Sequence, residues 1–319
     1  MTLYASFQNL EKYLNSCIVG QPDLTKKLII ALLCNGHLLV EGTPGLAKTK
    51  AIKILSSAID ASEQRVQFTP DLLPSDITGS DVYRPETHSF HFQKGPIFNN
   101  LILADEINRA PAKVQSALLE AMGERQITVG NTTYRLPDLF MVMATQNPIE
   151  QEGTYMLPEA QLDRFLFYVR IHYPDAEAER QILRIVRREE RQEPCPEFKK
   201  INEKTIFMAR EEVSRVYMSP EIEEYIIQLV MATRNPSAYG ADFAKYIGYG
   251  VSPRGTIALD ICSRGSAWLS GRDFVTPDDV RSIVYDVLRH RILPSFEGKA
   301  AGITSEDIID MLLQRVPMI

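Results

Sequence analysis

The residues with the clearest chemical potential form a glycine-rich loop, Gly42-Thr43-Pro44-Gly45-Leu46-Ala47-Lys48-Thr49. The loop follows the apolar run 37–40 and opens a helical pattern over residues 47–59. A loop in this position can direct backbone N–H groups and the amino end of a helix at a phosphate group. We therefore expect Lys48 to neutralise β- and γ-phosphate oxygens of ATP and the Thr49 hydroxyl to bind Mg²⁺.

One position of the loop departs from the usual pattern, because Ala47 stands where glycine is expected. A Cβ atom is tolerated there if the residue already has helical backbone angles. Taken alone, the segment could also be a Gly/Pro turn beside an unrelated lysine. The predicted ATP-binding residues of this segment are Gly42, Thr43, Pro44, Gly45, Leu46, Ala47, Lys48, Thr49 and Lys50.

Two consecutive carboxylates, Asp105 and Glu106, follow the fully apolar run 101–104. Ligands of open α/β sheets bind at the carboxyl ends of the strands. We therefore expect Asp105 to hold the Mg²⁺ shell and Glu106 to polarise the attacking water. An acidic turn after a strand would explain the pair in isolation, but its combination with Lys48 and Thr49 favours a catalytic site.

A polar segment, Thr145-Gln146-Asn147, follows another predicted strand, and Pro148 then takes the chain out of the sheet. An amide just past a central strand can reach the γ-phosphate and orient water. Asn147-Pro148 could equally start an ordinary turn, and this alternative stays open.

The first half of the chain alternates short apolar runs with helical patterns, which is typical of a parallel sheet covered by helices. Residues 80–95 and 126–136 interrupt this alternation as a β insert and a hairpin. Prolines near residue 195 predict a linker, beyond which the pattern is helical. We predict an α/β nucleotide-binding core in 1–195 and a small all-helical domain in 196–319. The expected strands are 37–40, 65–68, 101–104, 140–145 and 165–171.

The composition is that of an ordinary globular chain of 319 residues with a formal net charge of -6. An acidic chain argues against non-specific nucleic-acid binding, which depends on phosphate neutralisation by Lys and Arg. The N-terminus has no signal-peptide pattern and no apolar run is long enough to span a bilayer. The widely spaced cysteines are typical of reduced thiols, so we expect a cytoplasmic location. They are Cys17, Cys34, Cys195 and Cys262.

Together these motifs resemble the AAA+ superfamily and, within it, the MoxR-type ATPases of the helix-2-insert group. The resemblance covers nearly the whole chain and implies a P-loop NTPase core followed by a helical lid. In this family alanine is common before the loop lysine, so Ala47 agrees with the resemblance. The matching segments, in order, are Ile18 to Gln21, Gly42 to Thr49, Thr69 to Pro74, Asp105 to Ala110, Ala144 to Pro148, Leu162 to Phe165 and Ser252 to Arg254.

The resemblance implies further roles for residues along the chain. Val19 and Gly20 would border the adenine, and Asn147 would be the sensor-1 residue. Arg164 would be an arginine finger that enters the site of the adjacent protomer. Arg254 would be the sensor-2 residue, acting either in its own protomer or in its neighbour. Residues 80–95 would be the helix-2 insert and 126–136 the pre-sensor-1 hairpin.

The role of Arg164 has an alternative that does not involve catalysis. A cation supplied by a neighbour can be worth roughly 10³–10⁵ in rate, and it makes hydrolysis depend on assembly. Without the resemblance, a surface pair of Asp163 and Arg164 worth about 0–1 kcal/mol would be preferred. Arg109 is a second candidate because it closely follows the acidic pair.

The leading functional hypothesis is a Mg²⁺-dependent ATPase that remodels or matures other proteins. The resemblance implies a homo-oligomer, with a hexameric ring expected, and a von Willebrand A-domain partner acting on a protein client. The alternatives are a nucleic-acid motor, a magnesium-chelatase-like subunit and an ATP-gated assembly switch with little turnover. The sequence does not identify the client or the ring size.

Overall fold

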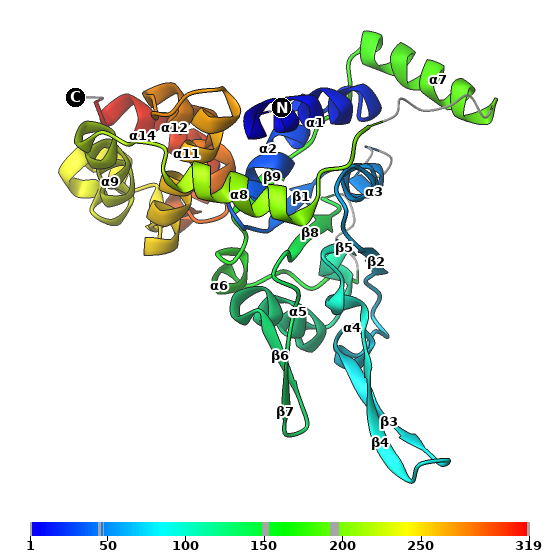
Figure 1. Ribbon diagram of the computed structural model, residues 1–319. Coiled ribbons are helices and arrows are strands. Elements are labelled where there is room, and N and C mark those ends of the chain that lie inside the picture. The colour runs from blue at the N-terminus through cyan, green and yellow to red at the C-terminus, as the bar shows by residue number, and fades with distance from the viewer. Residues whose placement is uncertain (1, 44–45, 47, 149–152, 192–197, 318–319) are drawn as a thin grey trace. The chain divides into compact units, whose positions relative to one another are not determined.

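The computed structural model describes residues 2–43, 46, 48–148, 153–191 and 198–317 (Figure 1). The chain forms two compact units. The first comprises Met1–Leu157 and Val169–Ile206, and the second comprises Pro158–Tyr168 and Phe207–Ile319. The predicted linker and the boundary at residues 195/196 lie outside the described residues.

The first unit is built on a five-stranded sheet in the order β2-β5-β8-β1-β9. The pairs β1–β8, β2–β5 and β5–β8 are parallel, which confirms the predicted fold class. The interior strands β5 and β8 are almost entirely buried, as expected for strands covered by helices on both faces. The strands are β1 Leu38–Glu41, β2 Glu63–Gln67, β5 Leu101–Asp105, β8 Met141–Gln146 and β9 Phe167–Arg170.

Helices and turns of the first unit connect these strands. Helix α2 is the most deeply placed, with most of its residues buried, and it begins at Pro22, where the missing N–H costs no helical hydrogen bond. The helices are α1 Leu3–Cys17, α2 Pro22–Leu33, α3 Lys48–Ala58, α4 Pro74–Thr78, α5 Ala112–Glu124 and α7 Ala176–Glu190, with 3₁₀ turns at Pro96–Phe98 and Ile107–Arg109.

Two antiparallel hairpins occupy the segments expected as the insert and the second hairpin. They are β3 Gly79–Arg84 with β4 Ser89–Lys94, and β6 Gln126–Val129 with β7 Thr132–Arg135. The rings of Phe92 and Tyr134 stack with centroids 4.0 Å apart, which joins the two hairpins. Gly79, at the base of the first hairpin, has φ +92°, and a Cβ atom there would lie 2.2 Å from the Gln93 carbonyl oxygen.

The second unit is helical apart from a small antiparallel ribbon of β10 Ile247–Tyr249 and β11 Leu293–Pro294. The sequence did not predict this ribbon, because strands of two and three residues are too short to show alternation. The helices are α6 Glu159–Leu162, α8 Glu203–Ser214, α9 Pro220–Arg234, α10 Ala241–Ala244, α11 Pro253–Leu269, α12 Pro277–Leu288, α13 Phe296–Ala300 and α14 Ser305–Arg315, with a 3₁₀ turn at Pro236–Tyr239.

Helix α12 begins with a capping box in which Asp279 has a central role. Its carboxylate accepts hydrogen bonds from the Thr276 N–H and hydroxyl, each at 2.8 Å, and from Arg272 at 2.6 and 2.8 Å. Burial alone would raise the pKa of Asp279, but the hydrogen bonds from Arg272 and Thr276 outweigh it and lower the pKa.

Among the described residues, no helix combines the length and the apolar character that crossing a membrane requires.

We predict that Asp279→Asn will lower the free energy of unfolding of the second unit by about 2–4 kcal/mol, because it removes the charge of a buried carboxylate that accepts hydrogen bonds from half-buried Arg272 and from Thr276. Because the folded pKa is lowered, this stabilisation is present above the unfolded pKa of aspartate and disappears as the pH falls through the folded pKa. Calorimetric unfolding at several pH values measures both effects. Asp278→Asn, at an exposed position of the same helical turn, is the matched control.

Candidate active site

Parallel strand order brings the chemically interesting residues to one edge of the sheet in the first unit. Strand β8 lies between β1, which leads into the glycine-rich loop, and β5, which ends at the acidic pair. Glu41 pairs with Gln146, and Ala104 pairs with Ala144. Because the carboxyl ends of these strands coincide, the loop, the amide segment and the carboxylates share the edge at which α/β proteins bind ligands.

The described part of the glycine-rich loop begins at Gly42, whose N–H donates to the Gln146 carbonyl at 3.3 Å. A Cβ atom at Gly42 would lie 2.3 Å from Ile171, so glycine is required by close packing. Lys48 begins helix α3 and its ammonium group donates to the Gly42 carbonyl across the loop.

The remaining predicted loop residues are placed as follows. Leu46 is buried, Thr43 and Lys50 are half-buried, and Thr49 is exposed. Thr43 Oγ1 is buried without a hydrogen-bond partner in the structure, so it is a polar atom that a bound phosphate could satisfy. The predicted residues Pro44, Gly45 and Ala47 lie outside the described residues.

The Asp105 carboxylate is almost fully buried and both of its oxygens accept hydrogen bonds. Oδ1 accepts from the Thr145 hydroxyl at 2.6 Å, and Oδ2 accepts from Arg65 Nη2 at 2.7 Å and Nε at 3.1 Å. Three charge-assisted bonds fix the orientation of this carboxylate at the end of β5. A carboxylate held in this way can accept hydrogen bonds from the water shell of a divalent cation.

Glu106 has a left-handed backbone conformation, with φ 57° and ψ 50°, which is unusual for a residue other than glycine. Its N–H donates to Thr145 Oγ1 at 2.9 Å, so one hydroxyl binds both members of the acidic pair. Consecutive strand residues would point to opposite faces of the sheet, and the left-handed turn breaks that alternation. Backbone strain of this kind typically marks functional sites.

The two carboxylates are also linked through strand β2. Arg65 and Gln67 are two residues apart and therefore share one face of that strand. Arg65 Nη2 donates to Gln67 Oε1 at 2.8 Å, and Gln67 Nε2 donates to Glu106 Oε2 at 2.8 Å. Arg109 Nε lies 3.0 Å from the same glutamate oxygen. A continuous chain of polar contacts therefore runs from Asp105 through Arg65 and Gln67 to Glu106.

Two predicted site regions complete this edge. Asn147 directly follows β8 and is buried, with 5% of its surface exposed, between the ends of β1 and β5 in strand order. Gly20 has φ +80°, and half-buried Val19 precedes it. The next residue, Gln21, donates to the His172 carbonyl at 2.7 Å, which ties this segment to the chain that follows β9.

The donor set of this edge fits Mg-ATP. A lysine, a threonine hydroxyl and the amino end of α3 suit phosphate oxygens, and a threonine hydroxyl with a carboxylate suits Mg²⁺. In the described part of the chain, no cluster of three or more His, Cys, Asp or Glu residues could hold a metal by itself. Mg²⁺ prefers one or two carboxylates together with substrate phosphates, and Asp105 with a bound nucleotide would supply them.

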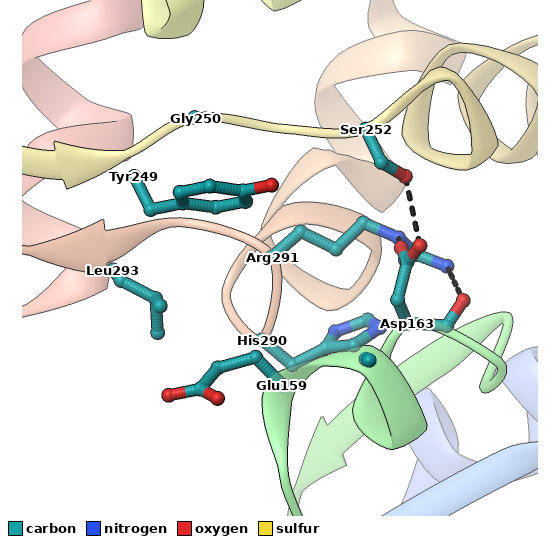
Figure 2. Close-up of a pocket in the computed structure, with 9 residues that line it drawn as sticks. Glu159, Asp163, Tyr249, Gly250, Ser252, His290, Arg291 and Leu293 are labelled. Atoms are coloured by element: carbon teal, nitrogen blue, oxygen red, sulfur yellow. Dashed lines mark hydrogen bonds and ion pairs between the residues drawn. The ribbon is translucent and has the colours of Figure 1, made fainter.

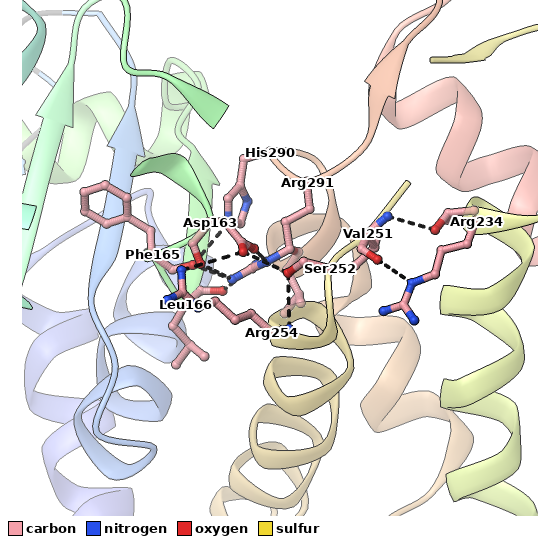
Figure 3. A network of polar contacts seen from close by, with 11 residues as sticks. Asp163, Phe165, Leu166, Arg234, Val251, Ser252, Arg254, His290 and Arg291 are labelled. Atoms are coloured by element: carbon pink, nitrogen blue, oxygen red, sulfur yellow. Dashed lines mark hydrogen bonds and ion pairs between the residues drawn. The ribbon is translucent and has the colours of Figure 1, made fainter. Parts of the chain in front are cut away.

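The two predicted arginines, Arg164 and Arg254, belong to the second unit, whereas the loop and the acidic pair belong to the first. Arg254 lies beside Asp163 (Figure 3). Arg254 Nη1 is 3.8 Å from Asp163 Oδ2, and Arg164 is the next residue along the chain. Arg254 is exposed and Arg164 is half-buried.

A cavity of about 500 Å³ lies beside Asp163 and Ser252 within the second unit (Figure 2). Tyr249 and Leu293 of the small ribbon, Glu159 of α6 and buried His290 are among its lining residues. Burial lowers the pKa of His290 well below its ordinary value, and neighbouring Arg291 lowers it further. His290 is therefore neutral near pH 7, and its Nε2–H donates to the Phe165 carbonyl at 3.1 Å.

Several residues that organise these sites were missed by sequence reasoning. Arg65 and Gln67 could have been noticed as polar residues two apart on a predicted strand, but their pairing with Asp105 and Glu106 depends on strand order. Arg291 and Ser252 contact Asp163 from 128 and 89 residues away, and no local pattern signals such contacts.

Comparison with known proteins gives a consistent assignment. Residues 37–167 match the model of the ATPase family associated with various cellular activities (AAA), and residues 241–312 match the AAA lid domain. A crystal structure from Cytophaga hutchinsonii, described as a candidate ATPase, superposes with a TM-score of 0.92 at 43% identity, covering 99% of this chain and 96% of that one.

Curated relatives are similar over nearly the whole chain. Chaperone MoxR1 of Mycobacterium tuberculosis is 42% identical, over 94% of this chain and 79% of the relative. YeaC of Bacillus subtilis, an uncharacterised protein, is 44% identical over 96% and 92%, respectively. Protein MoxR of Paracoccus denitrificans is 33% identical over 99% and 97%. The chain is therefore an ATPase that belongs to the MoxR-type family of the AAA+ superfamily.

Proposed function

We propose that the chain is a Mg²⁺-dependent ATPase that remodels or matures other proteins, with each active site completed by a neighbouring copy. The observation that carries the proposal is the acidic pair at the end of β5, held beside the glycine-rich loop by parallel strand order. The name of the Mycobacterium tuberculosis relative supports the chaperone-like role.

Substrate binding would use the glycine-rich loop of the first unit. Backbone N–H groups at the start of α3 and the Lys48 ammonium group would bind the β- and γ-phosphates. Thr49 and Asp105 would hold Mg²⁺, which neutralises charge on the phosphate oxygens when bound. In the structure the Lys48 ammonium group donates to the Gly42 carbonyl. On binding ATP it would donate to phosphate oxygens in place of that carbonyl. Val19 and Gly20 would border the adenine.

Hydrolysis would use Glu106 as the general base. Its carboxylate would accept a proton from the attacking water as the water oxygen bonds to the γ-phosphorus and the bond to the β–γ bridging oxygen breaks. Gln67 and Arg109 hold the Glu106 carboxylate at one oxygen, and the Thr145 hydroxyl holds its backbone. Asn147 would orient the water or the γ-phosphate.

The positions of the arginines support a shared site. Arg164 directly follows Asp163 in the chain, and Arg254 Nη1 lies 3.8 Å from Asp163 Oδ2, so both arginines belong to the same part of the second unit. We therefore propose that both act on the γ-phosphate bound by an adjacent protomer. Arg109 pairs with Glu106 of its own chain, and we assign the arginine-finger role to Arg164 instead.

The proposal extends to assembly and partners. We propose a homo-oligomeric ring of six copies, a von Willebrand A-domain partner and a protein client, as the resemblance to MoxR-type ATPases implies. The net charge of -6 argues against a nucleic-acid motor, because backbone phosphates require a cationic surface. The cytoplasmic location stays a prediction.

The first test concerns the site of the first unit. Lys48→Ala should abolish binding of ATP, because the loop loses the ammonium group assigned to the β- and γ-phosphates. Glu106→Gln should bind ATP with near-normal affinity and reduce kcat by about 10²–10⁴-fold, because the amide cannot accept the proton. Binding by fluorescent-nucleotide titration and phosphate release by a coupled assay measure the two effects.

Glu120→Gln, at an exposed position of α5, removes the same charge away from the site and should hydrolyse ATP normally. Undiminished hydrolysis by Glu106→Gln would exclude Glu106 as the base, and normal ATP affinity of Lys48→Ala would exclude the assigned phosphate site.

The second test concerns sharing between protomers. Hydrolysis per subunit should rise with protein concentration, and Arg164→Ala should reduce it by roughly 10³-fold or more while nucleotide binding persists. An equal mixture of Arg164→Ala and Lys48→Ala, each inactive alone, should regain activity, because about one interface in four combines an intact pocket with an intact arginine. A rate that is independent of dilution, with no recovery on mixing, would show that each protomer completes its own site.

A further inference from the structure

Arg291 is the most deeply buried charged residue near the predicted arginine finger. Its side chain is 3% exposed, and its guanidinium group makes all of its described contacts inside the second unit (Figure 3). Nε donates to Asp163 Oδ1 at 2.8 Å, and Nη2 donates to the backbone carbonyls of Asp163 at 3.3 Å and Phe165 at 2.7 Å. Nη1 donates to the carbonyls of Leu166, at 3.3 Å, and Val287.

These contacts hold the backbone on both sides of Arg164. The carbonyl of residue 163 is bonded to Arg291, and the N–H of Arg164 donates to the Gln161 carbonyl at 3.1 Å. The N–H of Phe165 donates to the Leu162 carbonyl at 3.0 Å. The carbonyl of Phe165 accepts a hydrogen bond from Arg291. With the adjoining peptide planes anchored, the direction in which the Arg164 side chain leaves the backbone is set.

The same arginine acts indirectly on Arg254. Asp163 uses one carboxylate oxygen for Arg291 and the other for α11, where Oδ2 accepts from the Ser252 hydroxyl at 2.8 Å and lies 3.8 Å from Arg254 Nη1. Ser252 also caps the first turn of α11, which carries Arg254. The Arg291–Asp163 pair therefore connects the segment bearing Arg164 with the helix bearing Arg254.

The geometry requires arginine rather than a generic cation. Guanidinium presents several N–H donors in a planar fork, whereas an ammonium group is a point charge with freely rotating donors. Burial lowers the pKa of Arg291, but pairing with Asp163 opposes this and the group remains charged. Apolar residues can often replace a buried ion pair without loss of stability. The orientation of the Arg291 N–H donors therefore points to a role in positioning rather than in stability alone.

We propose that Arg291, acting through Asp163, is a positioning residue that presents Arg164 and Arg254 together to the nucleotide of a neighbouring copy. This inference rests on the shared site proposed above. A displacement of a catalytic group by about 1 Å can cost about 10² in rate, so loss of the fork affects hydrolysis without removing either arginine.

The decisive variant is Arg291→Lys, which keeps the charge opposite Asp163 and loses the planar fork. It should bind a fluorescent ADP analogue within about twofold of the wild type, because ADP lacks the phosphate that the arginines meet, and should reduce kcat by about 10²-fold. Mixed with Lys48→Ala, it should recover activity to the level of the Arg164→Ala and Lys48→Ala mixture, since Lys48→Ala protomers supply correctly placed arginines.

Arg289→Lys is the matched control for a general loss of stability. Arg289 is a half-buried arginine that directly follows α12, with 10% of its side chain exposed, and it pairs with Asp286 and donates to the Tyr168 carbonyl at 2.9 Å. It makes no described contact with residues 163–166. Arg289→Lys should lower the melting temperature as Arg291→Lys does and should hydrolyse ATP at near the wild-type rate.

Wild-type turnover by Arg291→Lys would overturn the proposal, and so would equal losses in Arg291→Lys and Arg289→Lys. Failure of the Arg291→Lys mixture to recover, while the Arg164→Ala mixture does, would show a defect in the first unit's own pocket and would also refute it. If neither mixture recovers, the shared site itself is wrong. Should Arg291→Lys not fold, Asp163→Asn decides: reduced turnover that is rescued on mixing supports the proposal, and normal turnover rejects it.

Discussion

The parallel pairing of β5 with β8, and of β8 with β1, is the constraint on which the nucleotide site depends. It brings Asp105, Asn147 and Gly42 to the ends of neighbouring strands, although they are separated along the chain by helices and hairpins. The apolar character of β5 and β8 makes this arrangement stable, because both strands can be buried on both faces. The residues that we propose for nucleotide binding and water activation therefore lie at the edge of the sheet where the carboxyl ends of these strands meet.

Placing two carboxylates at a buried strand end is unfavourable unless their charges are bonded. The structure meets this requirement with neighbours from two strands: Thr145 of β8, and Arg65 with Gln67 of β2. Thr145 also accepts a hydrogen bond from the Glu106 N–H, which helps to hold the strained left-handed conformation of that residue. The same hydrogen bonds that compensate for burial therefore also orient the two acids.

The two compact units divide the chemistry between them. The first carries the groups that we propose bind the nucleotide and activate water, and the second carries Arg164, the residue after Asp163, and Arg254, which lies 3.8 Å from Asp163. Such a division would suit an enzyme whose turnover is regulated by assembly, because the proposed catalytic charges are divided between the two units. The buried Arg291–Asp163 pair gives the second unit a rigid way of presenting both arginines.

The sequence by itself determined the family and the strand runs, and it located the glycine-rich loop and the acidic pair that we propose as the nucleotide site. These features are local, because a loop between a strand and a helix, or a carboxylate after an apolar run, is recorded in adjacent residues. The tertiary structure alone decided that Arg65 pairs with Asp105, that Gln67 pairs with Glu106 and that Arg291 anchors the turn at Arg164. Those contacts join residues 39 to 128 positions apart, and they follow from strand order and helix packing, which local periodicity does not encode.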